Sequence, residues 1–334
     1  YAGIAGSHIK GFNSHGVIAV KGGEVSPRDI ERALDAAKAV AIPLDREVIH
    51  ILPQEYIVDD QRGIADPMGM AGVRLEGKVH IVTGAVTSAQ NIVRSCHKSG
   101  LDVSDIVLES LASAKAVLTE EEREIGVALI DLGGGTCDIA IFANDSIKHT
   151  GVLALGGQNL TNDIAFGLRT PMAAAEKIKI KHGAAIAEMV RPDEYIEVPS
   201  VGGREPRRLS RQVLAEICEP RMEEILTLLD QELVRSGLKN MIGAGVVLTG
   251  GTALIQGCQE LGEQVFNLPT RIGYPRNVGG LKDMVNSPKF ATAMGLLRFG
   301  AEKEGMEQKF RIRSDGNVFN SILSRMKKWF SEIS

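Results

Sequence analysis

The strongest chemical signal in the sequence is a glycine-rich turn between two apolar segments. Its sequence is Asp131-Leu-Gly-Gly-Gly-Thr-Cys-Asp138, and the candidate binding residues are Asp131, Gly133, Gly134, Gly135 and Thr136. Three consecutive glycines can adopt positive φ and present bare backbone N–H groups to an anion. Asp131 could hold Mg²⁺ through water, and the Thr136 hydroxyl could donate to a phosphate. An ordinary tight glycine hairpin is the alternative, but the flanking acids and apolar segments favour a phosphate-binding turn.

Two further glycine-rich turns stand at the starts of expected helices. Their residues are Gly250, Gly251 and Thr252 after the apolar segment 245–248, and Gly156 and Gly157 before a helix expected over 158–168. Glycines at such a junction let a flat ring or a phosphate approach the positive end of the helix. Either turn alone is weak evidence, because strand-to-helix loops often contain glycine.

A pair of opposite charges lies on the next helix, expected over 171–182. Glu176 and Lys179 are spaced i, i+3, which puts them on one helix face. A surface salt bridge is the simplest account of this pair if it stands alone.

The last residues carry the pattern of an amphipathic helix. From Val318, apolar side chains recur at helical spacing: Phe319, Ile322, Leu323, Met326, Phe330 and Ile333. Trp329 borders this face, and the flanking cations are Arg325, Lys327 and Lys328. Such a helix suits an anionic membrane surface, with an attraction of about 1 kcal/mol per cation. A helix that docks on the protein core is the alternative, but the polar segment before it, 304–316, favours the membrane.

Composition limits the class of protein. The chain has 334 residues, 44% of them hydrophobic and 24% charged, with a formal net charge of −4. These values exclude a disordered or fibrous chain and give no electrostatic reason to expect nucleic acid as a partner. The four cysteines form no CxxC pair, which argues against a zinc site or a disulfide framework. No stretch approaches the ~18 apolar residues of a transmembrane helix.

The predicted secondary structure that must position the turns changes its pattern near residue 88. Before it, Ser26 caps one helix, and strand candidates include 47–52, 55–58 and 73–83. This pattern predicts a compact α+β module with the helix lying on a small sheet. After residue 88, helices and strands alternate, including three successive strands within 126–153, which is typical of an α/β core. Ser210 is expected to cap a long helix.

Three glycine turns in this order, with a Glu-x-x-Lys helix between them, resemble the superfamily of actin, heat-shock ATPases and sugar kinases. Within that superfamily, the chain resembles the FtsA family of bacterial cell-division proteins over about residues 1–300. The segments that carry this resemblance are Ile51–Tyr56, Gly72–Leu75, Leu118–Gly126, Val198–Leu209, Leu214–Arg221 and Val246–Gly257.

The resemblance implies an α/β fold that is actin-like (ribonuclease H-like) and two-lobed, with an extra α+β subdomain and a C-terminal amphipathic helix. We expect the first lobe to comprise 1–4 and 87–125, interrupted by the extra subdomain at 5–86. The second lobe would have its core at 126–154 and 241–285, and an outer subdomain at 155–240. The remaining parts would be a return helix at 286–303, a linker at 304–317 and a membrane-targeting helix at 318–334.

The resemblance also implies ATP and Mg²⁺ as cofactors. Asp131 would lie near Mg²⁺, and the turn 133–136 would hold the β- and γ-phosphates. The ribose and adenine contacts would come from Glu176, Lys179, Gly250, Gly251 and Thr252. Glu109 occupies the place of a carboxylate that orients the attacking water in bacterial actins. ATP turnover is expected to be weak or absent.

Partners follow from the same resemblance. The C-terminal tail of FtsZ would dock on 198–229, where Arg221 and Glu224 lie i, i+3 on the long helix, and a solvated helix face is the alternative. The extra subdomain would contact later division proteins and other copies of the chain. The protein would be a peripheral adaptor on the cytoplasmic face of the inner membrane at the septum. It would polymerise with ATP and tether FtsZ filaments there.

One feature departs from the family pattern. The first phosphate hairpin, of the type D/E-x-G-T/S, has no counterpart here, since Tyr1 matches the last strand before the extra subdomain. We therefore expect a truncated gene product in which ATP binding is impaired. The alternative function is catalytic, as in a sugar kinase or a chaperone ATPase of the same superfamily. A sugar kinase needs a substrate-side catalytic Asp and a sugar pocket, and the sequence reveals neither.

Overall fold

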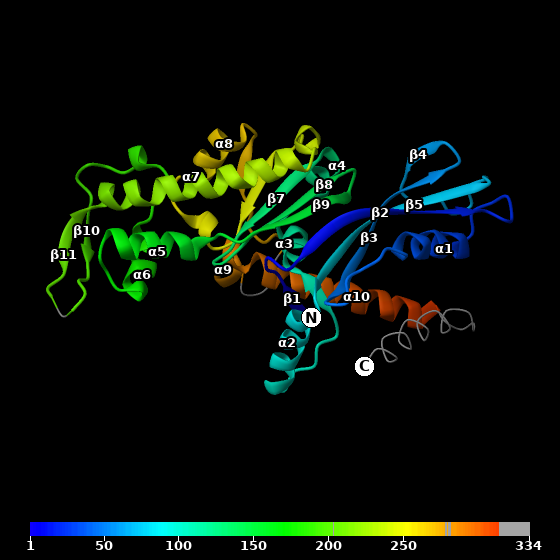
Figure 1. Ribbon diagram of the computed structural model, residues 1–334, viewed down its shortest axis with the longest axis horizontal. Coiled ribbons are helices and arrows are strands. Elements are labelled where there is room, and N and C mark those ends of the chain that lie inside the picture. Colours follow the sequence, from blue (N-terminus) through cyan, green and yellow to red (C-terminus); the bar gives the residue numbers. More distant parts are fainter. Residues whose placement is uncertain (203, 278, 280–281, 314–334) are drawn as a thin grey trace. The chain divides into compact units, whose positions relative to one another are not determined.

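The computed structural model describes residues 1–202, 204–277, 279 and 282–313 (Figure 1). The predicted membrane-targeting segment, 318–334, lies outside the described residues. Among the residues that are described, no helix is long and apolar enough to cross a bilayer. Residues 1–296 form one compact unit, which contains every site considered below.

A five-stranded sheet with the order β13-β12-β7-β8-β9 is the centre of the α/β part. Its strands are β7 (Val127–Leu132), β8 (Cys137–Ala143), β9 (Ser146–Leu153), β12 (Val246–Thr249) and β13 (Thr270–Ile272). β7 and β8 are buried along their whole length, because side chains of other elements cover both faces of the sheet. The three successive strands predicted within 126–153 are confirmed.

One face of this sheet shares a core with a group of helices. They are α5 (Gly157–Gly167), α6 (Met172–His182), α7 (Arg211–Arg235) and α8 (Cys258–Phe266). Ser210 caps α7 as predicted, and its hydroxyl accepts a hydrogen bond from the N–H of Gln212. The hairpin of β10 (Tyr195–Val198) and β11 (Arg207–Ser210) lies at the N-terminal end of α7 (Figure 1). Single 3₁₀ turns occur at η1 (Ala187–Met189), η2 (Lys239–Met241) and η3 (Thr252–Leu254).

The opposite face is covered by α3 (Glu109–Val117) and the start of α10 (Ala291–Arg313). The two helices cross closely at Gly295, where a Cβ would collide with the carbonyl oxygen of Ala112. The neighbouring elements are the parallel pair β1 (Ala2–Ile4) and β6 (Ile106–Leu108), α2 (Val86–Lys98), α4 (Glu120–Ile125), α9 (Lys282–Val285) and η4 (Pro288–Phe290).

α10 continues to Arg313, so residues 304–313 of the predicted linker are helical. Polarity suggested a linker, but residues 302–309 are mostly Glu, Lys, Met and Gln, which are strong helix formers. The single Gly305 costs only about 1 kcal/mol in a helix.

The extra subdomain is a four-stranded antiparallel sheet with the order β2-β5-β3-β4. Its elements are β2 (Lys10–Ala19), β3 (Arg46–Val58), β4 (Gln61–Ile64), β5 (Arg74–Ala85) and the helix α1 (Pro27–Lys38). α1 lies on one face (Figure 1), and Gly16 of β2 permits its close approach, because a Cβ there would collide with the Ala33 carbonyl. The predicted helix-on-sheet module is confirmed, although the two strands expected at 47–58 form one strand with a register shift.

The other face of the extra sheet meets β9 at a polar contact that we call the β9 junction (Asn13, Gln54, His80, Ile147 and Thr150). The ring of His80 lies 2.6 Å from Asn13 Oδ1 and 2.8 Å from Thr150 Oγ1. The Gln54 amide donates a 2.7 Å hydrogen bond to the carbonyl oxygen of Ile147. Hydrogen bonds to side chains and backbone thus join the extra subdomain directly to an edge strand of the central sheet.

Candidate nucleotide-binding site

The turn between β7 and β8 presents free backbone N–H groups. It is closed by a 3.0 Å hydrogen bond from the N–H of Gly133 to the carbonyl oxygen of Thr136. Gly134 and Gly135 are exposed, and a Cβ at either would meet nothing within 4 Å. Within the described part of the chain, the N–H groups of Gly134, Gly135 and Thr136 have no hydrogen-bond acceptor. Successive unpaired N–H groups in a turn form a concavity that suits an anion.

The other two glycine turns converge on the first one. Thr252 donates a 2.9 Å hydrogen bond from its hydroxyl to the carbonyl oxygen of Gly133. The same oxygen accepts a 2.9 Å hydrogen bond from the N–H of Gly157, at the start of α5. A Cβ on Gly156 would collide with the carbonyl of Gly134, and a Cβ on Gly157 would collide with the Thr252 hydroxyl. Close approach therefore requires glycine at both positions.

Glu176 and Lys179 support this arrangement from α6. The Lys179 ammonium is buried and lies 2.7 Å from a carboxylate oxygen of Glu176. It also donates 2.9 Å hydrogen bonds to the carbonyl oxygen of Gly157 and the hydroxyl of Thr161. Burial alone would raise the pKa of Glu176, but hydrogen bonds from Lys179 and Thr161 lower it. The pair is more than a surface salt bridge, because it fixes the N-terminus of α5.

Asp131 lies at the meeting point of four elements. Its carboxylate accepts hydrogen bonds from Ser113 of α3, at 2.6 Å, and from Thr292 of α10, at 3.3 Å. On the other side stands Gly250, whose φ of +87° and contact with Asp131 both exclude a side chain. Burial raises the pKa of Asp131, and the two hydroxyl hydrogen bonds oppose that rise.

Two more acidic side chains, Glu109 and Asp138, are close enough for the charge of Asp131 to affect their pKa values. Burial raises the pKa of Glu109, at the start of α3, and the charge of Asp131 raises it further. Asp138 lies directly opposite Asp131 in the β7–β8 register, and its pKa rises to about 7 through burial and the charges of Asp131 and Glu109. One oxygen of Asp138 accepts from Thr136 at 3.0 Å, while Oδ1 has no partner among the residues described. The site is thus short of positive charge.

Three residues of this site were missed by sequence reasoning. Asp138 stands in the glycine turn itself, but nothing in the sequence shows that it will be buried beside Asp131. Ser113 and Thr292 lie in helices that only the fold brings to β7. A hydroxyl in each of two helices that cross near the turn is the one signal that could have identified them.

Arg221 and Glu224 do lie together on α7, as predicted, but their charges are already paired. The Arg221 guanidinium binds both oxygens of Asp163 on α5, at 2.5 and 3.2 Å, and also binds Glu224. Asp163 raises the pKa of Arg221. This cluster connects α5 to α7, and Glu224 remains half exposed.

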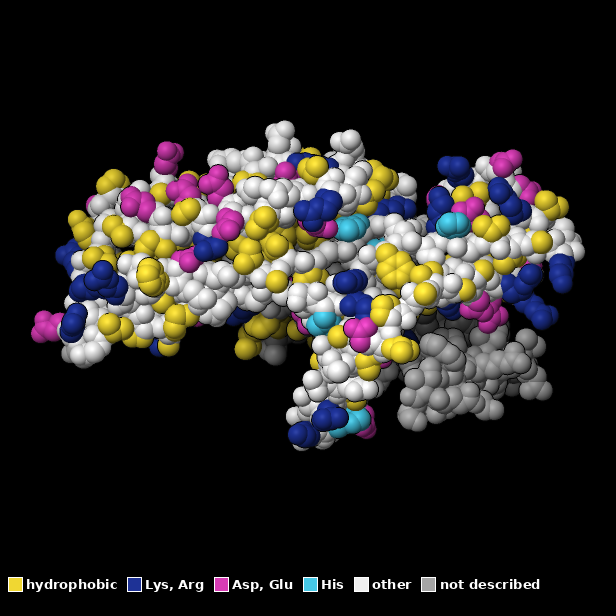
Figure 2. Space-filling model, viewed as in Figure 1, with side chains coloured by type: hydrophobic (Ala, Val, Ile, Leu, Met, Phe, Trp, Pro, Cys, Tyr) yellow, Lys and Arg dark blue, Asp and Glu magenta, His cyan; other side chains and the backbone are white. Residues whose placement is uncertain are grey.

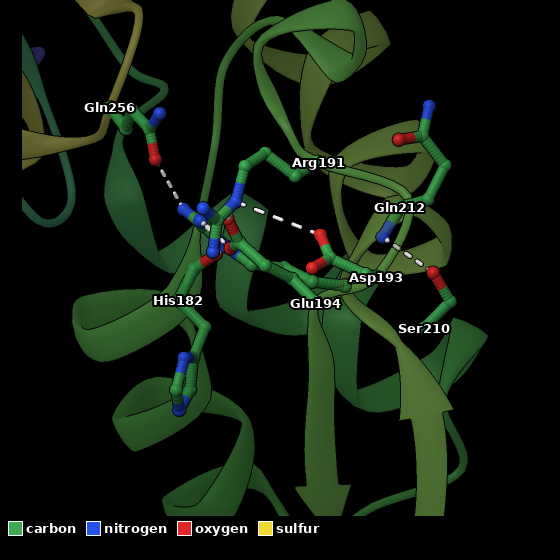
Figure 3. Close-up of polar contacts among 8 residues, drawn as sticks. His182, Arg191, Asp193, Glu194, Ser210, Gln212 and Gln256 are labelled. Carbon is green, nitrogen blue, oxygen red and sulfur yellow. Dashed lines mark hydrogen bonds and ion pairs between the residues drawn. The ribbon is translucent and has the colours of Figure 1, made fainter.

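The hairpin beside this surface is fixed by Arg211, whose partners Glu194, His182 and Gln256 are labelled in Figure 3. Its guanidinium binds Glu194 at 2.5 Å, the carbonyl oxygen of His182 at 2.8 Å, and Gln256. Figure 2 shows that basic side chains gather over β10 and β11. The hairpin thus has a firm attachment to α6 and α7.

Comparison with known proteins places the chain among close relatives. Residues 128–295 match the family model "Cell division protein FtsA", and residues 6–83 match "SHS2 domain inserted in FTSA". A protein of Pseudomonas aeruginosa, "Cell division protein FtsA", is 50% identical over 335 residues, which cover 98% of this chain and 80% of that protein.

Two solved structures have a similar backbone. The PilM–PilN type IV pilus biogenesis complex gives a TM-score of 0.59 at 15% identity, covering 89% of this chain and 78% of that chain. MreB5 of Spiroplasma citri bound to ADP gives 0.51 at 20% identity, covering 67% and 68%. At these identities the likeness concerns the fold alone, and it confirms the predicted actin-like α/β architecture.

Proposed function

The chain belongs to the FtsA family of cell division proteins, and we propose that it acts in division as an actin-like adaptor. In this proposal, ATP favours polymerisation, and the polymer tethers FtsZ filaments to the cytoplasmic face of the inner membrane at the septum. The convergence of three glycine turns on the carbonyl oxygen of Gly133, beside unpaired N–H groups, is the observation that supports it most.

Nucleotide binding is proposed for this convergence. The phosphates would lie against the N–H groups of the 133–136 turn, near the positive N-terminus of α5. The base would lie beside Gly250 and Gly251, and the ribose beside Glu176. The MreB5 structure that shares this fold was determined with ADP, which supports a nucleotide here.

Magnesium fits the acidic wall of the site. Like charge and burial raise the pKa values of Glu109 and Asp138, so a cation would stabilise their ionised forms. Over the described ranges, no three His, Cys, Asp or Glu side chains converge to hold a metal ion directly. Asp131 would therefore act through water. When bound, Mg²⁺ would offset phosphate charge.

Hydrolysis is proposed to be slow and secondary to assembly. Glu109 is the residue that would orient the attacking water, and burial raises its pKa, which strengthens it as a proton acceptor. A catalytic role, as in a sugar kinase or a chaperone ATPase, is the alternative. Rapid multiple turnover without polymer formation would favour it.

FtsZ-tail docking is proposed for α7 around Arg221. Because Arg221 already binds Asp163 and Glu224, an incoming acidic tail would exchange with Glu224, the more exposed of the two acids. The tail would then bind the Arg221 guanidinium, which Asp163 holds in place. Contacts with later division proteins are proposed for the extra subdomain.

Liposome flotation tests the tether. The intact chain and a version ending at Gly316 are mixed with FtsZ filaments, ATP and vesicles that contain anionic lipid. We expect the intact chain to carry FtsZ to the vesicles and the shortened version to leave it in solution. Equal flotation of FtsZ with both versions contradicts the proposal, and vesicles without anionic lipid are the control for charge.

A further inference from the structure

A pocket of about 410 Å³ lies beside the β9 junction, between the face of the extra sheet that meets β9 and the second lobe. Its floor includes His15, Glu55 and Lys78, from three neighbouring strands of the extra sheet. Its wall comes from the second lobe, through Asn144, Lys148, Leu238 and Met241. Its volume is within the range of ligand sites, about 300–1,000 Å³.

The pocket carries two lysines and one glutamate, whose charge acts on both lysines. Lys78 is paired with Glu55 at 2.7 Å, and this hydrogen bond lowers the pKa of Glu55. The Lys148 ammonium, in contrast, has neither an ion pair nor a hydrogen bond among the residues that the structure describes. Burial lowers the pKa of Lys148, so its charge is incompletely solvated. A bound carboxylate would correct this deficit.

The pocket is also bordered by an open strand edge. β2 is at the edge of the extra sheet. The N–H of Val20 donates a hydrogen bond to the carbonyl oxygen of Val73, so, counting back from Val20, every second residue of β2 hydrogen-bonds to β5 and the residues between them do not. By this alternation, the backbone groups of Asn13, His15 and Val17 point away from β5. Over the described ranges, these groups have no backbone hydrogen-bond partner on the outer side. An extended peptide could add to this edge.

Apolar surface completes the pocket. Met241 is 40% exposed and stands beside Leu238 on the wall, and Val17 is 48% exposed on the edge strand. We propose that this pocket docks an extended acidic segment of a partner protein. The segment pairs with the edge of β2, its carboxylate meets Lys148, and its apolar side chains cover Met241 and Leu238. This inference deepens the proposed contact of the extra subdomain with other division proteins and rests on it, whereas neither nucleotide nor FtsZ takes part in it.

The test uses the full chain and a blocked, fluorescein-labelled peptide of seven residues in which Val and Glu alternate. Fluorescence anisotropy measures its affinity, and a matched peptide has Gln in place of Glu. We expect the Gln peptide to bind at least about tenfold more weakly, which corresponds to about 1.4 kcal/mol. N-methylation of the peptide amides that face β2 should weaken binding by a similar factor.

Two charge reversals locate the site. Lys148→Glu should weaken binding of the acidic peptide at least tenfold. Lys177→Glu, on the exposed surface of α6, should leave the affinity for this peptide unchanged. Equal melting temperatures of both variants show that the fold is intact. Equal affinity for the two peptides, equal loss in the two variants, or no binding of the acidic peptide at millimolar concentration overturns the proposal. The proposal is also overturned if Lys148→Glu, without any peptide, sediments differently from the parent protein, because the pocket would then be occupied by a second copy of the chain.

Discussion

The Lys179 ammonium donates a 2.9 Å hydrogen bond to the carbonyl oxygen of Gly157, which ties α6 to the first residue of α5. Gly157 in turn binds the carbonyl oxygen of Gly133, in the central glycine turn. Lys179 therefore positions the turn without reaching the exposed N–H groups that would hold phosphate. A residue predicted as a ribose contact acts at least as much through the backbone.

Removing this ammonium tests its positioning role. Lys179→Met should lower the free energy of unfolding by about 2 kcal/mol, because it removes the cation paired with Glu176 and a buried hydrogen bond to the carbonyl oxygen of Gly157. It should also weaken binding of a fluorescent ATP analogue. Chemical denaturation and titration measure the two effects. The control is Lys181→Met, an exposed lysine of the same helix, and equal effects of both variants would refute the role.

Asp138 should make the protein less stable as pH rises. Its pKa in the folded chain is about 7 and its ordinary value is 3.8. Between these values the folded chain keeps a proton that the unfolded chain has released, so stability falls from about pH 4 to pH 7, by up to about 1.4 kcal/mol per pH unit. Asp138→Asn should remove this dependence in urea unfolding without magnesium. An unchanged pH profile in the variant would contradict the assignment.

His80 should have the opposite effect. Burial and the charge of His149 lower the pKa of His80 to about 4, from 6.5. Between these values only the unfolded chain binds the proton, so stability falls as pH drops from about 6.5 to 4. His80→Gln keeps a hydrogen-bonding side chain at the β9 junction but cannot titrate in this range. Urea midpoints near pH 7 and pH 5 should differ less in this variant than in the parent, and an equal difference would exclude His80 as the cause.

Arg221→Glu should weaken binding of an FtsZ-tail peptide at least about tenfold, which corresponds to about 1.4 kcal/mol. The change puts three acids together at Asp163 and Glu224, so a small loss of stability is also expected. Arg235→Glu is the matched control, since Arg235 pairs with Glu232 on an exposed part of the same helix. Unchanged peptide affinity in Arg221→Glu would remove the site from α7.

The sequence was most informative where the determinants are local. A run of glycines between apolar strands, a Ser cap before a long helix, and the alternation of helix and strand can all be recognised within a few residues of sequence. The three glycine turns could therefore be predicted, and the order of the turns along the chain led to the fold.

The remaining parts of the site depend on distant contacts. Ser113 and Thr292 are ordinary helix hydroxyls until α3 and α10 cross beside Asp131. Lys179 looked like half of a surface pair, because spacing alone does not reveal burial. The helical state of residues 304–313 was missed for a different reason, since polarity was weighed above helix propensity.

At the β9 junction, Gln54 and Asn13 bind carbonyl oxygens of β9 rather than its side chains. Such a contact constrains positions 13 and 54 but places no demand on which amino acids occupy 147 and 148. Evolution can therefore exchange the side chain at 148, and with it the ligand of the neighbouring pocket, without loosening the attachment of the extra subdomain. Lineages should vary at 148 more freely than at 54.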